Sequence, residues 1–430
     1  MRYKLLPSSF FIKNRETLSA RLKFGSLLII HGNGLVISNR DANYPFQQDS
    51  DFFYLTGIDQ PNCALILFPN HPIKENREIL FTKKNDEKTL IWEGEHLSNE
   101  KISFLSGIKH IEDIKDIHQF IQNLFRQAEY VYLKGGEDDK MTPVQSFNSY
   151  YEKQYRNRYP LKKYESLKPH LHNLRRIKAP AEIDLIQNAI GITKAGFDKA
   201  IKALRPGVME YVIESNFISE FISRGSKGFA FDPIIASGSD TCILHYIKND
   251  KICKDDELVL MDIGAEYARY NADITRVFPI NRRFTKRQKE VYQAVLNVMS
   301  LSIQEISTNL TLKDFNKIVA TIMEDELLRL NLISSKDISR QNKEQPAYKK
   351  YFMHSGSHYL GLDVHDVGDT RQKLLPGVVI TLEPGIYIRE ENLGIRLEND
   401  ILITDKGYNN LSSNIPILIE EVENWINDPD

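Results

Sequence analysis

Four acidic residues lie inside apolar segments of the C-terminal half, and this placement constrains the fold more than any other feature of the chain. Asp262 and Asp273 stand eleven residues apart in LVLMDIGAEYARYNADITRVF, each within an apolar run that is typical of a buried strand. Glu383 and Glu398 occupy equivalent places in VVITLEPGIYI and GIRLENDILIT. Ionised carboxylates in buried strands cost much free energy unless a cation balances them. The pattern therefore predicts a buried cation site.

A histidine completes the set. With His358, the four carboxylates match two divalent metal ions, because four negative charges would balance four positive charges. Each residue alone has another interpretation: Glu383, before Pro384, could end a strand, and Glu398 could form a buried ion pair with Arg396. The two matched carboxylate pairs together favour the metal site.

The segment around Asp262 indicates how the site is built. Leu258, Leu260 and Asp262 share one face of the predicted strand, and the residues between them are also apolar. A strand with two apolar faces is a central strand. Asp262 should therefore point into the protein.

The chain divides into two halves. Residues 1–170 alternate strand-like runs with helix-like stretches, which predicts an α/β domain. A basic, proline-containing stretch marks the boundary, so we expect one domain over 1–172 and a second over 173–430. Within that stretch Pro180 precedes a helical pattern. The second domain has helices followed by an antiparallel strand pair twice over, which indicates an internal duplication within an α/β (α+β) fold.

Composition excludes several classes of partner and location. Lys plus Arg number 56 and Asp plus Glu 58, so the net charge of −2 gives no electrostatic case for binding nucleic acid or membranes. Three cysteines, without CxxC spacing, are too few for a disulfide framework. No apolar run approaches the 18 or more residues of a spanning helix. We expect a soluble, cytoplasmic protein.

Histidines gather in YFMHSGSHYLGLDVHDVGD, which contains His354, His358 and His365. His354 and His358 have the spacing of a helical zinc motif, but Ser355 stands where that motif has glutamate, and Gly356 disfavours a helix. The alternative is a glycine-broken loop with solvated histidines. His245, in CILHYIKND, is a further candidate site residue only because the other candidates are present, since a single histidine is normally structural. Other chemistries find little support: the sequence has no GxSxG elbow, no P-loop and no cysteine in a nucleophile context.

These residues carry a family resemblance. The sequence resembles aminopeptidase P, the Xaa-Pro aminopeptidase branch of the pita-bread metallopeptidases, over nearly its whole length. The matching segments are DANYPFQQDSDFFYLTGIDQPNCALILF (41–68), CILHY (242–246), residues 258–292, FMHSGSHYLGLDVHDVG (352–368), PGVVITLEPGIYI (376–388) and GIRLENDILIT (394–404). The resemblance implies an N-terminal aminopeptidase P domain followed by a pita-bread catalytic domain with two pseudo-duplicated halves.

The resemblance also implies roles for individual residues. One metal would be held by Asp273, His358, Glu383 and Glu398, and the other by Asp262 together with Asp273 and Glu398, which would bridge the two. A hydroxide between the metals would be the nucleophile, and Glu383 would move its proton to the leaving nitrogen. His365 would stabilise the scissile carbonyl, His354 would hold the proline side, and His245 and Arg396 would line the substrate site. Manganese is the expected metal, with zinc or cobalt as alternatives.

The implied activity is removal of the N-terminal residue from peptides with proline in second position. In the family, the N-terminal domain reaches the active site of a neighbouring subunit, which implies a homodimer or homotetramer and places Asp41 and Trp92 at the far end of the substrate cleft. Two alternatives remain open. Prolidase shares all the metal ligands but cleaves only dipeptides, and a pita-bread pseudoenzyme would bind partner proteins without catalysis.

Overall fold

The computed structural model describes residues 3–135, 146–342 and 344–428 of the chain. They form two compact units: Leu5–Arg175, and a second unit that contains residues 3–4 and the described residues from Arg176 onward. Among the described residues, no helix is both long enough and apolar enough to cross a membrane.

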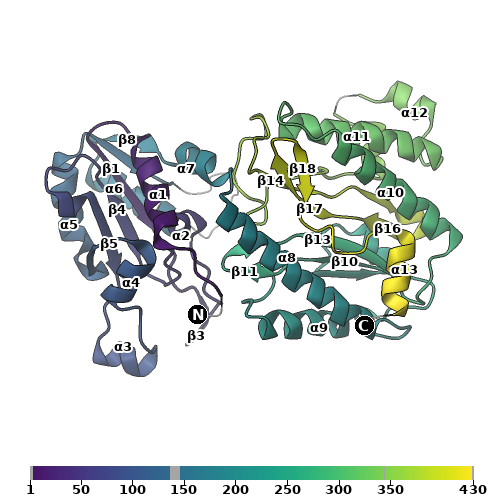
Figure 1. Ribbon diagram of the computed structural model, residues 1–430, viewed down its shortest axis with the longest axis horizontal. Coiled ribbons are helices and arrows are strands. Elements are labelled where there is room, and N and C mark those ends of the chain that lie inside the picture. Colours follow the sequence, from purple (N-terminus) through teal and green to yellow (C-terminus); the bar gives the residue numbers. More distant parts are fainter. Residues whose placement is uncertain (1–2, 136–145, 343, 429–430) are drawn as a thin grey trace. The chain divides into compact units, whose positions relative to one another are not determined.

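The N-terminal unit is built on a mixed six-stranded sheet (Figure 1) with the order β6-β5-β4-β1-β7-β8. The central strand β1 pairs antiparallel with β4 and parallel with β7. This is the α/β arrangement that the alternating segments predicted. The strands are β1 Ser26–His31, β4 Ala64–Leu67, β5 Glu78–Thr82, β6 His110–Asp113, β7 Tyr130–Leu133 and β8 Lys163–Ser166, with a separate hairpin of β2 Ile37–Asn39 and β3 Ala42–Asn43.

Apolar periodicity explains how helices cover this sheet. In α5 the residues Ile117, Ile121 and Leu124 recur at helical spacing, and they pack with Phe81 and Val131 of the sheet in one buried cluster. The helices of this unit are α1 Ser8–Ser19, α2 Ser50–Thr56, α3 Glu87–Trp92, α4 Asn99–Ser106, α5 Ile117–Gln127, α6 Phe147–Arg158 and α7 Lys168–Arg175.

The second unit repeats one order of elements, as the sequence predicted: two long helices, then an antiparallel three-stranded sheet. The two sheets have the orders β13-β10-β9 and β14-β17-β18. Helices α8 and α9 lie on one side of the strands and α10 and α11 on the other (Figure 1). The first half contains α8 Pro180–Ala200, α9 Glu210–Ser223, β9 Ile234–Ser237, β10 Leu258–Ile263, β11 Glu266–Tyr267, β12 Tyr270–Asn271 and β13 Ile274–Pro279. The second contains α10 Lys286–Gln304, α11 Leu312–Arg329, α12 Ser335–Arg340, β14 Val379–Leu382, β15 Gly385–Ile388, β16 Leu393–Arg396, β17 Asn399–Thr404, β18 Gly407–Asn410 and α13 Ile419–Asn427.

One of the four acidic residues lies inside a strand, and the other three lie next to the end of a strand. Asp262 lies inside β10, the central strand of its sheet, and β10 is buried along its whole length, as predicted. The prediction that all four lie within strands is wrong for the other three, because Asp273 precedes β13, Glu383 follows β14 and Glu398 precedes β17. Beside Glu383, Pro384 has no N–H to donate to a neighbouring strand, so the apolar run is divided between β14 and β15.

The histidine-rich segment forms a loop rather than a helix. Residues 351–378 are irregular apart from two isolated bridges, one between Tyr359 and Ile380 and one between Thr311 and Lys373. At Gly356 the loop passes close to α11, where an added Cβ would lie 2.5 Å from Cγ1 of Val319. A side chain at this position would push the loop away from α11.

Candidate active site

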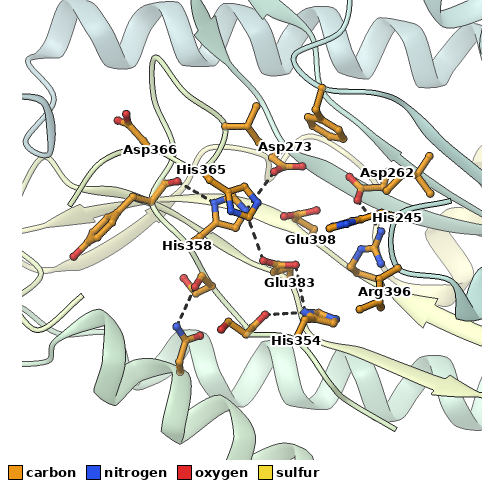
Figure 2. A pocket seen from close by; sticks show the side chains of 18 of the residues that line it. His245, Asp262, Asp273, His354, His358, His365, Asp366, Glu383, Arg396 and Glu398 are labelled. Atoms are coloured by element: carbon orange, nitrogen blue, oxygen red, sulfur yellow. Dashed lines mark hydrogen bonds and ion pairs between the residues drawn. The ribbon is translucent and has the colours of Figure 1, made fainter. Parts of the chain in front are cut away.

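A cavity of about 750 Å³ in the second unit collects the predicted residues of this unit (Figure 2). Strands of the first sheet, residues that flank β14 and β17, and the histidine-rich loop contribute to its wall, so residues more than a hundred positions apart in the chain meet there. The predicted residues that line it are His245, Asp262, Asp273, His354, His358, His365, Glu383, Arg396 and Glu398.

Three of these residues have the geometry of a metal site. Asp273, His358 and Glu398 each offer one ligand atom, and these atoms lie within 4.8 Å of one another. Nε2 of His358 lies 3.4 Å from Oδ2 of Asp273 and 3.6 Å from Oε1 of Glu383. The other ring nitrogen, Nδ1, donates a hydrogen bond to the carbonyl oxygen of Tyr359 at 2.9 Å. Because a carbonyl only accepts, Nδ1 carries the proton and Nε2 is free to bind a cation.

The carboxylates of the cluster are buried and repel one another, so a bound cation would stabilise their ionised forms. Burial and repulsion from neighbouring carboxylates raise the pKa values of Asp273 and Glu398 well above their ordinary range. Burial also raises the pKa of Glu383 to about 7. The Oδ1 atom of Asp262 is buried and has no hydrogen-bond partner in the described part of the chain. A set of oxygen donors with one imidazole, held together against their own repulsion, fits divalent metal ions.

Arg396 begins a chain of hydrogen bonds along the same wall. Its Nη2 donates to Oδ2 of Asp262 at 2.7 Å, and its Nη1 donates to the hydroxyl of Tyr387 at 2.9 Å. That hydroxyl lies 2.8 Å from Nε2 of His354, whose Nδ1 donates to the carbonyl of Ser355 at 2.8 Å. The ring of His354 therefore accepts from Tyr387. Burial lowers the pKa of His354 to about 3, so this imidazole is neutral.

The two remaining histidines face the cavity with exposed side chains. The ring of His365 stacks on the ring of His358, with 4.0 Å between the ring centroids and 17° between the planes. His365 is therefore held against a predicted metal ligand without being part of the three-residue cluster. His245 follows the short 3₁₀ helix η4 (Gly238–Cys242) and lies beside Asp262 and Arg396 in Figure 2.

Asp41 and Trp92 belong to the N-terminal unit. Asp41 lies in the turn between β2 and β3 and is exposed, and Trp92 ends α3 with 80% of its surface exposed. Their place in a substrate cleft stays a prediction.

Two residues of the site were not predicted from the sequence. Tyr387 joins Arg396 to His354, and Asp400 is fully buried in β17, where it accepts a hydrogen bond from the backbone N–H of Asp273 at 3.2 Å. Burial raises the pKa of Asp400 to about 8. A signal for Asp400 was present, because it is a further acidic residue in an apolar run. Tyr387 gave no signal of its own, since a tyrosine in a buried strand is ordinary.

Comparisons with known proteins agree with this geometry. The profile of Metallopeptidase family M24 matches residues 184–405, and that of the aminopeptidase P N-terminal domain matches residues 11–132. The chain is 33% identical to the Xaa-Pro aminopeptidase of Haemophilus influenzae over 98% of both chains. It is also 33% identical to the Xaa-Pro aminopeptidase of Escherichia coli over 96% of both.

Solved structures extend the similarity to three dimensions. Zinc-substituted Escherichia coli aminopeptidase P in complex with product superposes with a TM-score of 0.89 at 30% identity, covering 99% of this chain and 100% of the other. The same enzyme with the inhibitor Pro-Leu gives a TM-score of 0.88 at 31% identity, covering 99% of each chain.

Proposed function

The chain belongs to metallopeptidase family M24 and is an Xaa-Pro aminopeptidase with the pita-bread fold, and from this premise we propose how its residues carry out the reaction. It hydrolyses the bond between an N-terminal residue and a proline in second position. One observation carries the proposal: the carboxylates and the histidine predicted as ligands line one cavity, where their ligand atoms lie close together against their mutual repulsion.

We propose that the cluster holds two manganese ions per subunit. Asp273, His358, Glu383 and Glu398 would hold one ion, and Asp262 would hold the other with Asp273 and Glu398 as bridges. The metal supplies a nucleophilic water near neutral pH and balances negative charge that develops on the substrate. Manganese suits a donor set with more oxygen than nitrogen, and zinc or cobalt could occupy the same ligands.

Glu383 is the residue suited to moving a proton. Its Oε1 lies 3.6 Å from Nε2 of the predicted ligand His358, and a carboxylate is a group that can take up a proton and release it. Its Oε2 lies 3.6 Å from Nδ1 of His354, so the carboxylate faces the cavity between two imidazoles. We assign Glu383 the transfer of a proton from water to the proline nitrogen that leaves.

His365 and His354 act on the two ends of the scissile bond. His365 donates to the carbonyl oxygen as negative charge develops there, and its stacking on His358 keeps it beside the reacting centre. Both ring nitrogens of His354 are engaged within the protein, so His354 contacts the proline side through its ring surface. His245 and Arg396 complete the substrate wall, and Arg396 also holds Asp262 in place.

The N-terminal unit is proposed to serve a neighbouring subunit. We assign it a role in forming a homodimer or homotetramer and in closing the substrate cleft with Asp41 and Trp92. The exposure of Leu90, Ile91 and Trp92 at the end of α3 supports this, because apolar side chains on a surface often mark an interface. We propose that the enzyme works in the cytoplasm, which agrees with its three free, buried cysteines.

Removing the metal tests the proposed chemistry. Exhaustive chelation should abolish hydrolysis of an Xaa-Pro-Yaa tripeptide, and manganese should restore it with about two ions per subunit by elemental analysis. Full activity in protein shown to be free of metal would contradict the proposal. Restoration by zinc or cobalt but not by manganese would contradict only the choice of metal.

A further inference from the structure

A buried ion pair includes Asp366, which follows His365 in the loop that lines the cavity. Nζ of Lys178 donates to Oδ2 of Asp366 at 2.9 Å, and each side chain is only 1% exposed. Lys178 lies two residues before α8, and Asp366 follows His365 in the chain. Burying two charged side chains costs free energy. Because Lys178 has no role in the proposed reaction so far, its burial beside Asp366 needs an explanation.

The backbone of Lys178 is itself fixed. Its N–H donates to the carbonyl of Gly377 at 2.8 Å, and its ammonium lies 3.5 Å from the carbonyl of Arg176. Two residues later α8 begins, and Glu182 in its first turn accepts from the N–H of Ala179 at 2.8 Å. The ammonium therefore projects from a rigid helix start.

The loop beside Asp366 is built to receive this ammonium. The N–H of Asp366 donates to the carbonyl of Tyr359 at 2.9 Å, which closes the loop on itself. At Gly361 an added Cβ would lie 2.3 Å from Oδ2 of Asp366 and 2.8 Å from Cε of Lys178. Only glycine leaves room for the ion pair at this position.

A second set of hydrogen bonds joins the same loop to the hairpin of β11 and β12, which precedes the predicted ligand Asp273. Nδ2 of Asn271 donates to the carbonyls of Gly361 and Leu362 at 3.1 and 3.0 Å. The neighbouring hydroxyl of Tyr270 donates to Oε1 of Glu182 at 2.9 Å. The start of α8, the hairpin before Asp273 and the loop that carries His365 are thus one connected unit, which includes the ion pair of Lys178 and Asp366.

We propose that Lys178 is a positioning residue of the peptidase reaction, which holds the carboxylate of Asp366 and so fixes the orientation of His365 in the cavity. The inference rests on the role proposed above for His365. The ammonium of Lys178 contacts Asp366 and the carbonyl of Arg176, and neither residue is a predicted metal ligand. It acts through Asp366 alone.

The test begins with Lys178→Met, which keeps a long side chain and removes the ammonium. With manganese bound, kcat for an Xaa-Pro-Yaa tripeptide should fall about tenfold to a hundredfold, the range expected when a catalytic group moves by about 1 Å. KM and metal content should change little, because the lost interaction acts on the transition state. Lys178→Arg should recover most of the lost kcat, since it restores a cation opposite Asp366.

A double variant separates positioning from stability. Lys178→Met with Asp366→Asn leaves no unpaired buried charge, so a purely structural role predicts that kcat returns to the wild-type value. Positioning predicts that kcat stays low, because methionine and asparagine form no ion pair. The matched control is Lys194→Met on α8, which removes a partly exposed pair with Asp198 at 2.8 Å and should leave kcat unchanged.

A mutant cycle with His365→Ala tests the route of the effect. In that background Lys178→Met should change kcat by less than about threefold, because the residue through which it acts is absent. An undiminished loss in that background, or a double variant with wild-type kcat, would overturn the inference while leaving the role of His365 intact. If His365→Ala itself kept a normal kcat, the proposed function of His365 would fail first.

Discussion

Replacing Glu383 by glutamine should stabilise the metal-free protein and inactivate the loaded enzyme. Burial raises the pKa of this carboxyl from 4.5 to about 7. The folded chain therefore binds the proton more tightly than the unfolded chain, and folding favours the neutral form. As the pH rises from 4.5 to about 7, the folded protein must either keep a proton that the unfolded chain releases or bury a charge. Glutamine has no such charge to bury.

The size of the effect follows from the shift. A rise in the pKa of Glu383 from 4.5 to about 7 corresponds to about 3 kcal/mol of unfolding free energy. In the wild-type protein this free energy is retained below pH 4.5 and is lost by the time the pH has passed 7. The advantage of the variant should therefore be small at pH 4.5 and should reach about 3 kcal/mol at pH 8. Comparing two pH values removes any constant difference in packing between the two side chains.

Urea unfolding with a chelator present measures this difference. Trp425 packs against Phe197 and Phe278 in the second unit, so its fluorescence should report unfolding there. The only other tryptophan, Trp92, is 80% exposed and should contribute little change. With manganese added, the wild-type protein should be more stable than the variant, because glutamine is a poorer metal ligand than an ionised carboxylate. If the variant gained no stability between pH 4.5 and pH 8, burial would not raise the pKa of Glu383 in the metal-free protein.

Three further predictions follow from the same site. His365→Ala should keep its full metal content and lose about a hundredfold to a thousandfold in kcat, as for other donors to a developing oxyanion, and loss of metal would instead make it a ligand. Asp262→Asn should lower both metal content and rate, because it removes an anionic ligand whose Oδ1 lacks a hydrogen-bond partner among the described residues; an unchanged metal content would argue against that assignment. The rise in Tm caused by manganese should grow from pH 5.5 to pH 8, because Asp273 and Glu398, with raised pKa values, must release protons to bind metal; a rise independent of pH would count against metal binding there.

Much of the site could be predicted because its signals are local. A carboxylate in an apolar run is visible within ten residues of sequence, and the parity of residues around Asp262 indicated a central strand that the structure confirms. The loop character of the segment around His354 and His358 followed from Gly356. Each of these features is determined by a short stretch of sequence, so no contact between distant residues is needed to predict it.

What could not be predicted depends on contacts between distant segments. Lys178 and Asp366 are 188 residues apart, and only the folded chain shows that they form an ion pair. The link from Arg396 through Tyr387 to His354 also depends on the fold, because His354 lies 33 residues from Tyr387 in the chain. The position of Glu383 outside its strand was missed because the apolar pattern continues past Pro384, whereas the strand pairing does not.

The most direct test of the central claim is to identify the products released from a set of peptides. Manganese-loaded protein should release only the first residue from Xaa-Pro-Yaa and from longer Xaa-Pro peptides, and it should leave matched Xaa-Ala peptides uncut. Chelation should stop all cleavage. Mass spectrometry of the products distinguishes the alternatives, because cleavage limited to the Xaa-Pro dipeptide would indicate a prolidase. Absence of cleavage in protein that binds its metals would indicate a binding protein built on the same fold.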